Sequence, residues 1–372
     1  MKVAMVTGSR ADWNGLGMVG KCLRDEYKVT VEVIAIGQMA EVSSHLEQVF
    51  WDGFNPHVLH TDYKEDMVCG AGKATLLVGP LLAAIRPDVV LVLGDRFEIL
   101  GAATAAALQF IPVAHIGGGD ITEGAIDNKI RYAITALADL HFVTHLDSYR
   151  RVGRSQRTST GEFKSDTVLC TGAPALDRIR LCQDIVAKDS FFEWVGLTQS
   201  KYNILVACHS TTLDPDSATC ASEMVDALEG IQDASFIVLG TNSDSGSHEV
   251  AKILTSFVMQ FGDNRAELIQ NLAPPLFYAA LTHCDCMVGN SSAGLVETAT
   301  FGIPVVNIGN RQKGRPSPMN VLNCSDDWAD IKKTIMLALT NGRLPCKSPY
   351  GDGHSAPLIA KALTGQFLDR MF

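Results

Sequence analysis

Short apolar runs alternate with longer amphipathic stretches along the whole chain. In the first half the runs are rich in β-branched residues and end at Gly or a polar turn; they lie at 3–8, 29–37, 89–94, 112–118, 140–145 and 167–172. Amphipathic stretches between them predict helices at 68–84, 97–110 and 126–138. Nearly continuous apolar strands that alternate with helices are typical of a parallel sheet covered on both faces. We therefore predict a doubly wound, Rossmann-like α/β lobe.

The pattern starts again in the second half, where apolar runs lie at 203–210, 235–242, 266–272, 286–291 and 304–309. A Thr-Gly-Ala-Pro turn at 171–174 separates the halves, and 177–200 predicts connecting helices. The predicted architecture is α/β, with two Rossmann-like parallel-sheet lobes at 1–175 and 176–350 and a terminal amphipathic helix at 355–372. Ligands of such sheets bind beyond the carboxyl ends of the strands, so the active site is expected in a cleft between the lobes.

Composition narrows the class of partner. The 372 residues include 31 Lys and Arg against 41 Asp and Glu, a net charge of −10, and 47% are hydrophobic. An acidic chain without a long basic tract argues against nucleic acid and against an anionic membrane. We find no uncharged apolar run of about 18 residues and no signal-peptide pattern, so a cytoplasmic protein with a small-molecule substrate is expected.

Ten cysteines lack any CxxC spacing, and several lie inside apolar strand-like runs. Buried thiols that act as small hydrophobic residues explain this placement better than disulfides or zinc. Cys284 and Cys286 would share one face of a strand, but no His or Cys pair nearby completes a tetrahedral set. No metal site and no metal cofactor are therefore predicted.

Polar residues follow the predicted strands of the first half. Gly8 to Gly15 follows the first strand, and its backbone N–H groups together with Arg10 suit an anion, although an ordinary tight turn explains the loop equally well. The loop is not GxGxxG and the second strand ends without an acidic residue, which disfavours a nicotinamide dehydrogenase.

Carboxylates collect after the next two strands of the first half. Asp95 ends one strand, while Asp120, Glu123 and Asp127 follow another. Carboxylates at adjacent strand ends can serve as general acid and base, although each one taken alone could equally cap a helix. His209 closes the first strand of the second half, where it is either a group that faces the cleft or an ordinary buried histidine.

The second half carries a denser anion signal. Ser291 and Ser292 follow an apolar strand and open a helix, and Glu297 lies about one turn further on, where it can accept from sugar hydroxyls. A plain Ser N-cap would explain only one of these serines. Arg311 belongs to a loop with three cations, which is either a phosphate contact or a solvated basic loop.

Together, the motifs GSRAD, GDRFE, HIGGGDITEGAIDNKIRYAIT, NSSAGLVE and GNRQKGR resemble the hydrolysing UDP-N-acetylglucosamine 2-epimerases of the sialic-acid pathway, in order from residue 6 to about 325. The resemblance implies a two-lobed GT-B fold whose terminal helix returns to the first lobe. It implies conversion of UDP-N-acetylglucosamine to N-acetylmannosamine and UDP, by elimination to a 2-acetamidoglycal and then hydration. No cofactor is expected, the UDP-sugar is the expected partner, and a homodimer or homotetramer is the expected assembly.

Residue roles also come from this resemblance. Catalytic roles fall on Asp95, Asp120, Asp127 and His209. Substrate or UDP contacts fall on Arg10, Asn14, Arg96, Glu123, Arg131, Asn242, Ser291, Ser292, Glu297 and Arg311.

Two departures from the family pattern affect the expected sugar site. Gly117 stands where part of the family has a carboxylate, so Asp120 or Glu123 is expected to take over that proton transfer. Met39 replaces a possible sugar-contacting His. The substrate could therefore also be UDP-2,4-diacetamido-2,4,6-trideoxyglucose, the compound used for legionaminic acid. A GT-B glycosyltransferase and a non-catalytic nucleotide-sugar sensor are the competing readings, and release of UDP without an acceptor separates the epimerase from both.

Overall fold

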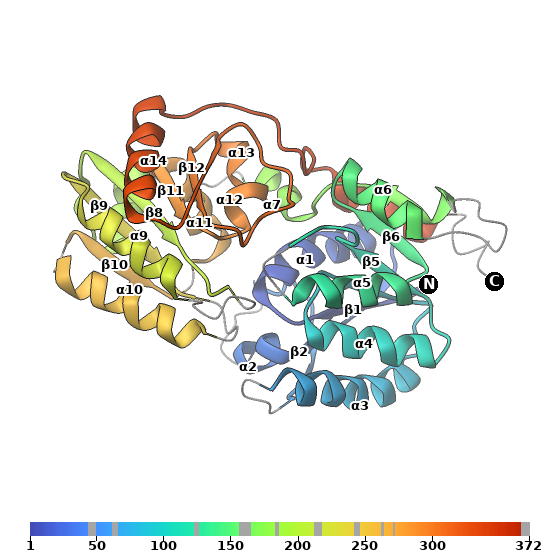
Figure 1. Cartoon of the computed structure of the whole chain (residues 1–372). Helices are drawn as coiled ribbons and strands as arrows, with labels where there is room; N and C mark the ends of the chain where they lie inside the picture. Colours follow the sequence, from blue (N-terminus) through green and yellow to red (C-terminus); the bar gives the residue numbers. More distant parts are fainter. Residues whose placement is uncertain are drawn as a thin grey trace. The chain divides into compact units, whose positions relative to one another are not determined.

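The computed structural model describes the chain apart from residues 44–49, 62–65, 123–125, 156–164, 183–185, 212–217, 242–245, 262–263, 271 and 366–372. The chain forms two compact units (Figure 1). Unit 1 contains Met1–Asp120, Asp127–Leu181 and Tyr350–Phe372, and unit 2 contains Ile121–Ile126 and Cys182–Pro349.

Unit 1 is built on a parallel sheet of seven strands in the order β3-β2-β1-β4-β5-β6-β7. The strands are β1 (Lys2–Thr7), β2 (Thr30–Ile36), β3 (His57–Leu59), β4 (Val89–Leu93), β5 (Val113–Ile116), β6 (Leu140–Val143) and β7 (Val168–Cys170). Every strand predicted for the first half is present. The pattern missed β3, because it has only three residues and is partly exposed, so it makes no apolar run.

Helices cover both faces of this sheet. They are α1 (Arg10–Asp25), α2 (Gly37–Ser43), α3 (Met67–Ile85), α4 (Phe97–Leu108), α5 (Asp127–Leu137), α6 (Leu146–Ser155), α7 (Ala175–Leu181) and α15 (Ser355–Thr364). The core between the sheet and α1 and α15 is one apolar cluster, and the core beneath α3, α4 and α5 is another. The arrangement of an apolar sheet between two helical layers is the predicted one.

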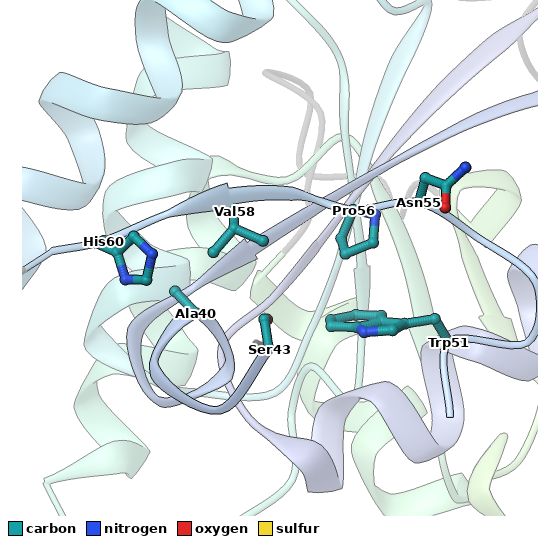
Figure 2. A pocket seen from close by; sticks show the side chains of 7 residues that line it. All are labelled: Ala40, Ser43, Trp51, Asn55, Pro56, Val58 and His60. Atoms are coloured by element: carbon teal, nitrogen blue, oxygen red, sulfur yellow. The ribbon is translucent and has the colours of Figure 1, made fainter. Parts of the chain in front are cut away.

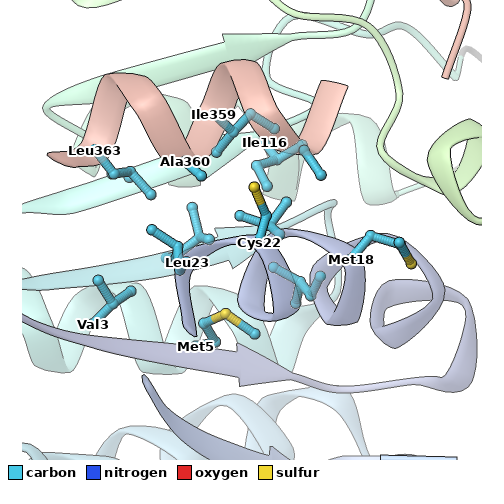
Figure 3. Packing of buried hydrophobic residues seen from close by; sticks show 14 of the residues in the cluster. Val3, Met5, Met18, Cys22, Leu23, Ile116, Ile359, Ala360 and Leu363 are labelled. Carbon is cyan, nitrogen blue, oxygen red and sulfur yellow. The ribbon is translucent and has the colours of Figure 1, made fainter. Parts of the chain in front are cut away.

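The last described helix, α15, belongs to unit 1. Ile359, Ala360 and Leu363 pack against Cys22 and Leu23 of α1 (Figure 3). The first turn of α15 is capped from a distance. Asp177 of α7 is 1% exposed, and its carboxylate accepts from the N–H groups of Ser355 and Ala356 at 3.0 and 2.8 Å. A side chain far away in sequence thus satisfies N–H groups that a helix start leaves open.

Helix α3 is long and apolar, although the sequence contains no uncharged apolar run of about 18 residues. By length and composition it is the one described helix that could cross a membrane, and 28% of its apolar window is buried inside the protein. It contains Lys73 and Pro80, and it packs against α4. One such helix is weak evidence for a membrane span, because core helices pass the same test.

Unit 2 repeats the same design with six parallel strands in the order β10-β9-β8-β11-β12-β13. They are β8 (Tyr202–Ala207), β9 (Ala234–Leu239), β10 (Ala266–Ile269), β11 (Cys286–Gly289), β12 (Val305–Ile308) and β13 (Val321–Cys324). The pattern missed β13, whose four residues include Asn323 and are mostly half-exposed or exposed. The helices are α8 (Lys188–Val195), α9 (Thr219–Glu229), α10 (Ser247–Phe261), α11 (Pro274–His283), α12 (Ala293–Val296), α13 (Thr298–Phe301) and α14 (Trp328–Asn341).

Both sheets reverse their strand order at one place, between β1 and β4 in unit 1 and between β8 and β11 in unit 2. The loops that leave the carboxyl ends of these strands diverge toward opposite faces, and the gap between them is where doubly wound sheets bind ligands. Among the described residues, no group of three or more His, Cys, Asp and Glu side chains is placed to hold a metal ion. All ten cysteines are free thiols.

Candidate functional site

In unit 1, the turn after β1 is closed by its own side chains. Ser9 caps α1 by accepting from the N–H of Asp12 at 3.2 Å, and the Asp12 carboxylate accepts from the N–H of Gly8 at 3.2 Å. Burial raises the pKa of Asp12 to about 6, although the nearby Arg96 favours its charge. Two N–H groups expected to attract an anion are therefore engaged internally. Arg10 and Asn14, on the first turn of α1, are both partly exposed.

Arg96 follows β4 and forms a buried ion pair. Its guanidinium donates to both carboxylate oxygens of Glu98 at 3.2 and 3.0 Å, and the Glu98 side chain is 0% exposed. The Arg96 side chain also lies against Gly8, so it joins the loops after β1 and β4. Because a paired guanidinium balances the buried Glu98, Arg96 has a structural task beside the predicted substrate contact.

Asp95 lies at the reversal point of the first sheet and is held by Arg131. Arg131 of α5 is 3% exposed and donates to the Asp95 carboxylate and, at 2.7 Å, to the backbone carbonyl of Asp120. The Asp95 side chain remains 23% exposed. The guanidinium of Arg131 fixes the direction of the Asp95 carboxylate. The structure thus brings together two residues that the sequence predicted separately.

One carboxylate oxygen of Asp120 makes contacts with the residues after β6 and with α6. Its carboxylate accepts from the hydroxyls of Thr144 and Ser148 at 2.7 and 2.6 Å, and it lies 3.3 Å from Nε2 of His145. Its side chain is only 13% exposed. These contacts tie the glycine-rich loop after β5 to the end of β6 and the start of α6. These contacts help to hold the loop in place, and the catalytic role of Asp120 stays a prediction.

The departures from the family pattern have clear structural settings. Gly117 has φ +81°, and a Cβ placed on it would meet no atom within 4 Å, so open space lies beside the end of β5. Met39 is 0% exposed and packs in the apolar core of unit 1. Asp127 begins α5 and is partly exposed. Glu123 and Asn242 lie outside the described residues.

Unit 1 has a cavity that these residues do not line. It has a volume of about 360 Å³ and lies beside α2 and β3 (Figure 2). Figure 2 shows His60 at one end and Trp51, Pro56 and Asn55 at the other. None of the predicted site residues lines it.

In unit 2, a cavity of about 190 Å³ opens at the reversal point of the sheet. Its walls come from the ends of β8, β9 and β11, the loop after β10 and the helix α11; they are Ala207, His209, Leu239, Gly240, Gln270, Leu272, Phe277, Met287, Ser291 and Ala293. The sequence predicted His209 and Ser291. It missed Leu272 and Phe277, because apolar residues next to a strand or in a helix are typical of a core, and it missed Gln270, because this residue falls within the predicted strand at 266–272. An aromatic ring, apolar walls and one side-chain amide suit a flat heterocycle with polar edges.

His209 stands at the rim of this cavity. Close packing lowers the pKa of His209 to about 3, and the positive charge of Arg311 adds to the effect. The imidazole is therefore neutral at pH 7 in the free protein. A neutral imidazole can donate one hydrogen bond to a phosphate, but it can donate a proton only after an anion has raised its pKa.

The serine-rich loop follows β11, Glu297 lies between α12 and α13, and Arg311 lies in the loop after β12. Helix α12 has only four residues, so the hydroxyls of Ser291 and Ser292 contribute more to an anion site there than a helix dipole does. Glu297 is 9% exposed, and burial raises its pKa to about 7. Arg311 donates to the backbone carbonyl of Asn290 at 3.2 Å, which places it beside this loop.

Known proteins match nearly the whole chain. Residues 21–364 match the family model described as UDP-N-acetylglucosamine 2-epimerase. The chain is 30% identical over 362 residues to the UDP-N,N'-diacetylbacillosamine 2-epimerase (hydrolyzing) of Legionella pneumophila, covering 95% of this chain and 93% of the relative. It is 24% identical to the UDP-N-acetylglucosamine 2-epimerase of Neisseria meningitidis, covering 95% and 91%.

Solved structures agree on the fold. The crystal structure of UDP-GlcNAc 2-epimerase from Neisseria meningitidis bound to UDP-GlcNAc superposes with a TM-score of 0.81 at 17% identity, covering 98% of this chain and 99% of that one. The predicted two-lobed, GT-B-like fold is thereby confirmed. The family match, the two reversal points and their polar residues lead to one conclusion: the chain belongs to the UDP-N-acetylglucosamine 2-epimerase family.

Proposed function

We propose that this protein is a hydrolysing 2-epimerase of a UDP-linked 2-acetamido sugar, which converts UDP-N-acetylglucosamine and water to N-acetylmannosamine and UDP. The observation that carries the proposal is the Arg131-held Asp95 at the reversal point of the first sheet. A carboxylate that is held in one direction and is 23% exposed can reach a bound substrate and exchange a proton with it. The named activities of the relatives from Legionella and Neisseria support the same reaction class.

The reaction requires proton transfer at C2 on both faces of the sugar ring. A base removes the C2 proton while the C1–O bond to UDP breaks, and the bonding pair leaves with UDP to give a 2-acetamidoglycal. Water then adds at C1, and C2 receives a proton from the opposite face. We assign these transfers to Asp95 and Asp127, with Glu123 as a further candidate and Asp120 as a positioning residue. Arg131 connects Asp95 with the Asp120 loop, so both are set by one guanidinium.

Unit 2 is proposed to bind the nucleotide. The uracil fits the 190 Å³ cavity, with its ring against Phe277 and its polar edge toward Gln270. The ribose hydroxyls donate to Glu297. The diphosphate is contacted by neutral His209, Ser291, Ser292 and Arg311, whose donors stabilise the charge that UDP carries away. Arg10, Asn14 and Asn242 remain proposed nucleotide contacts, and Arg96 a proposed substrate contact.

The sugar carried by the UDP has two candidates. UDP-2,4-diacetamido-2,4,6-trideoxyglucose is the second candidate, because the space beside Gly117 is open and the Legionella relative is named for a diacetamido sugar. Gly117→Asn tests this, since Asn tolerates positive φ better than other residues with a side chain. If the open space admits the second acetamido group, the variant should lose activity on the diacetamido substrate more than on UDP-N-acetylglucosamine.

The reaction class is tested by incubating the protein with UDP-N-acetylglucosamine and no acceptor. We expect stoichiometric release of UDP and a free sugar whose proton NMR spectrum is that of N-acetylmannosamine, and we expect neither from Asp95→Asn. UDP-N-acetylmannosamine as the product would identify a non-hydrolysing epimerase, and release that needs an added alcohol would identify a glycosyltransferase. We further propose that the protein is cytoplasmic and forms a homodimer or homotetramer. Light scattering on the purified protein tests the assembly.

A further inference from the structure

Asn290, the residue that follows β11, forms a junction between three segments of unit 2. Its side chain is buried, with 1% of the residue exposed. The side-chain carbonyl accepts from the N–H of His209 at 2.8 Å, and the side-chain amide donates to the carbonyl of His209 at 2.8 Å. The same amide lies 3.7 Å from Sγ of Cys220 in the first turn of α9. One side chain thus reaches both the end of β8 and the start of α9.

The backbone of Asn290 makes a different set of contacts. Its N–H donates to the carbonyl of Ala207 at 3.1 Å, which continues the ladder between β8 and β11. Its carbonyl accepts from Arg311 at 3.2 Å and from Gln312 at 2.8 Å, both in the loop after β12. Gln312 is 2% exposed, so this end of the loop is fixed within the protein.

The two sets of contacts depend on each other. In a parallel ladder that continued by one residue, the N–H of His209 would donate to the backbone carbonyl of Asn290. The side-chain carbonyl of Asn290 takes that donor instead, and the backbone carbonyl is released to accept from Arg311 and Gln312. Among the common side chains, Asn is the one whose amide sits close enough to its own backbone to replace a peptide group in this way.

The strand end is built for this exchange. Gly289 has φ +140°, and a Cβ on it would collide with the carbonyl of Ala207. The chain can therefore turn away from the ladder only with Gly at this position, and the turn presents the side chain of Asn290 to His209 in place of its backbone.

We propose that Asn290 is a positioning residue that sets His209 and Arg311 at the spacing required by the diphosphate of the substrate. The inference rests on the proposed function, because it takes His209 and Arg311 as diphosphate contacts. Without the side-chain amide, the N–H of His209 returns to the backbone carbonyl of Asn290 and competes there with Arg311 and Gln312. Both diphosphate contacts then shift, although neither residue has been changed.

The test compares Asn290→Ala with Asn203→Ala. Asn203 is also buried, at 2% exposure, and lies at the opposite end of β8, where its side chain bonds Ser200, Ser235 and Asp285. Both variants lose a buried amide on the same pair of strands, so a general loss of stability affects both. We expect UDP affinity, measured by calorimetry, to fall at least about tenfold in Asn290→Ala and to stay within about twofold in Asn203→Ala.

A second readout separates this inference from the proposed function. The ring signal of His209, assigned in the NMR spectrum by its loss in His209→Gln, should move in ligand-free Asn290→Ala and stay in Asn203→Ala. If Asn290→Ala fails to fold, Asn290→Ser replaces it in both measurements. Should the wild-type protein not bind UDP, the proposed function fails and the His209 signal alone decides. Wild-type UDP affinity in a folded Asn290 variant, or an unmoved His209 signal, overturns the proposal.

Discussion

The buried carboxyl of Glu297 leads to a prediction about UDP binding and pH. Burial raises the pKa of Glu297 to about 7 from the ordinary 4.5. In our proposal the ribose hydroxyls donate to the ionised carboxylate, so only the deprotonated protein binds tightly. With a pKa near 7, about a tenth of the protein is ionised at pH 6 and about nine tenths at pH 8, so the UDP dissociation constant should fall about tenfold between these pH values.

Calorimetric titration of UDP at several pH values between 6 and 8 measures the effect. Glu297→Gln is the matched control, because its amide has the size of the carboxyl and no charge to titrate. The phosphate groups of UDP and every other ionisable residue titrate equally in both proteins, so the difference between the two pH profiles belongs to Glu297. Profiles of equal slope in the wild type and Glu297→Gln would refute the assignment of Glu297 to the ribose.

The same group should influence stability in the opposite direction. Because the folded protein binds the Glu297 proton more tightly than the unfolded chain, its contribution to the free energy of unfolding is fully present below pH 4.5 and is lost as the pH rises through 7. The shift corresponds to about 3 kcal/mol at most. Urea unfolding of Glu297→Gln should therefore lack this loss, and equal pH dependence in both proteins would contradict the raised pKa.

Four further outcomes follow from the structure. Asp95→Asn and Asp127→Asn should each lower kcat at least about a hundredfold and abolish deuterium incorporation at C2, with UDP affinity within a few-fold of wild type; wild-type turnover by Asp95→Asn would disprove the mechanism. Asp120→Asn should instead lower the free energy of unfolding in urea by about 1–3 kcal/mol, because it disturbs the Thr144 and Ser148 contacts, and intact stability with lost turnover would restore its catalytic role. Dialysis against EDTA should leave UDP release unchanged, whereas activity that returns only with a divalent ion would contradict the absence of a required metal. His141 is buried, and neither ring nitrogen has a hydrogen-bond partner among the residues that the structure describes, so His141→Leu should raise the free energy of unfolding by about 1 kcal/mol at pH 7. Burial lowers the pKa of His141 to about 3, so the unfolded chain gains a proton as the pH falls below 6.5, and the gain from His141→Leu should grow there; a less stable variant would contradict this account.

The strands and helices of both units could be predicted because their signal is local. A strand buried on both faces needs an unbroken apolar run, and β1, β4 and β8 are such runs. The pattern failed at β3 and β13, each of which is one edge strand of its sheet and has partly polar side chains that are mostly half-exposed or exposed. At those positions it is pairing with a neighbouring strand, rather than burial, that makes the segment a strand.

Part of the candidate site was also predictable. Asp95, His209 and Ser291 follow apolar strands directly, and parallel sheets place such positions along one edge. Phe277 was missed, because a ligand wall of this kind has the same residue types as a protein core, and Gln270 was missed, because it lies within a predicted strand. Asn290 is part of the serine-rich motif, but its contacts with His209 and Arg311 join positions that are 81 and 21 residues away in the sequence. A local pattern does not indicate such contacts.

The amino-acid sequence by itself determined the class of the protein: two doubly wound sheets and polar residues at the ends of their strands follow from apolar periodicity and from motif order. Only the tertiary structure decided what individual polar groups can do. Thr144 and Ser148 donate to the carboxylate of Asp120, and Arg131 donates to the carboxylate of Asp95 across 36 positions of sequence. The pKa of Glu297 is raised by the atoms that enclose it. Burial, ion pairing and hydrogen bonding of this kind arise between distant segments, and a local pattern carries no information about which segments will meet.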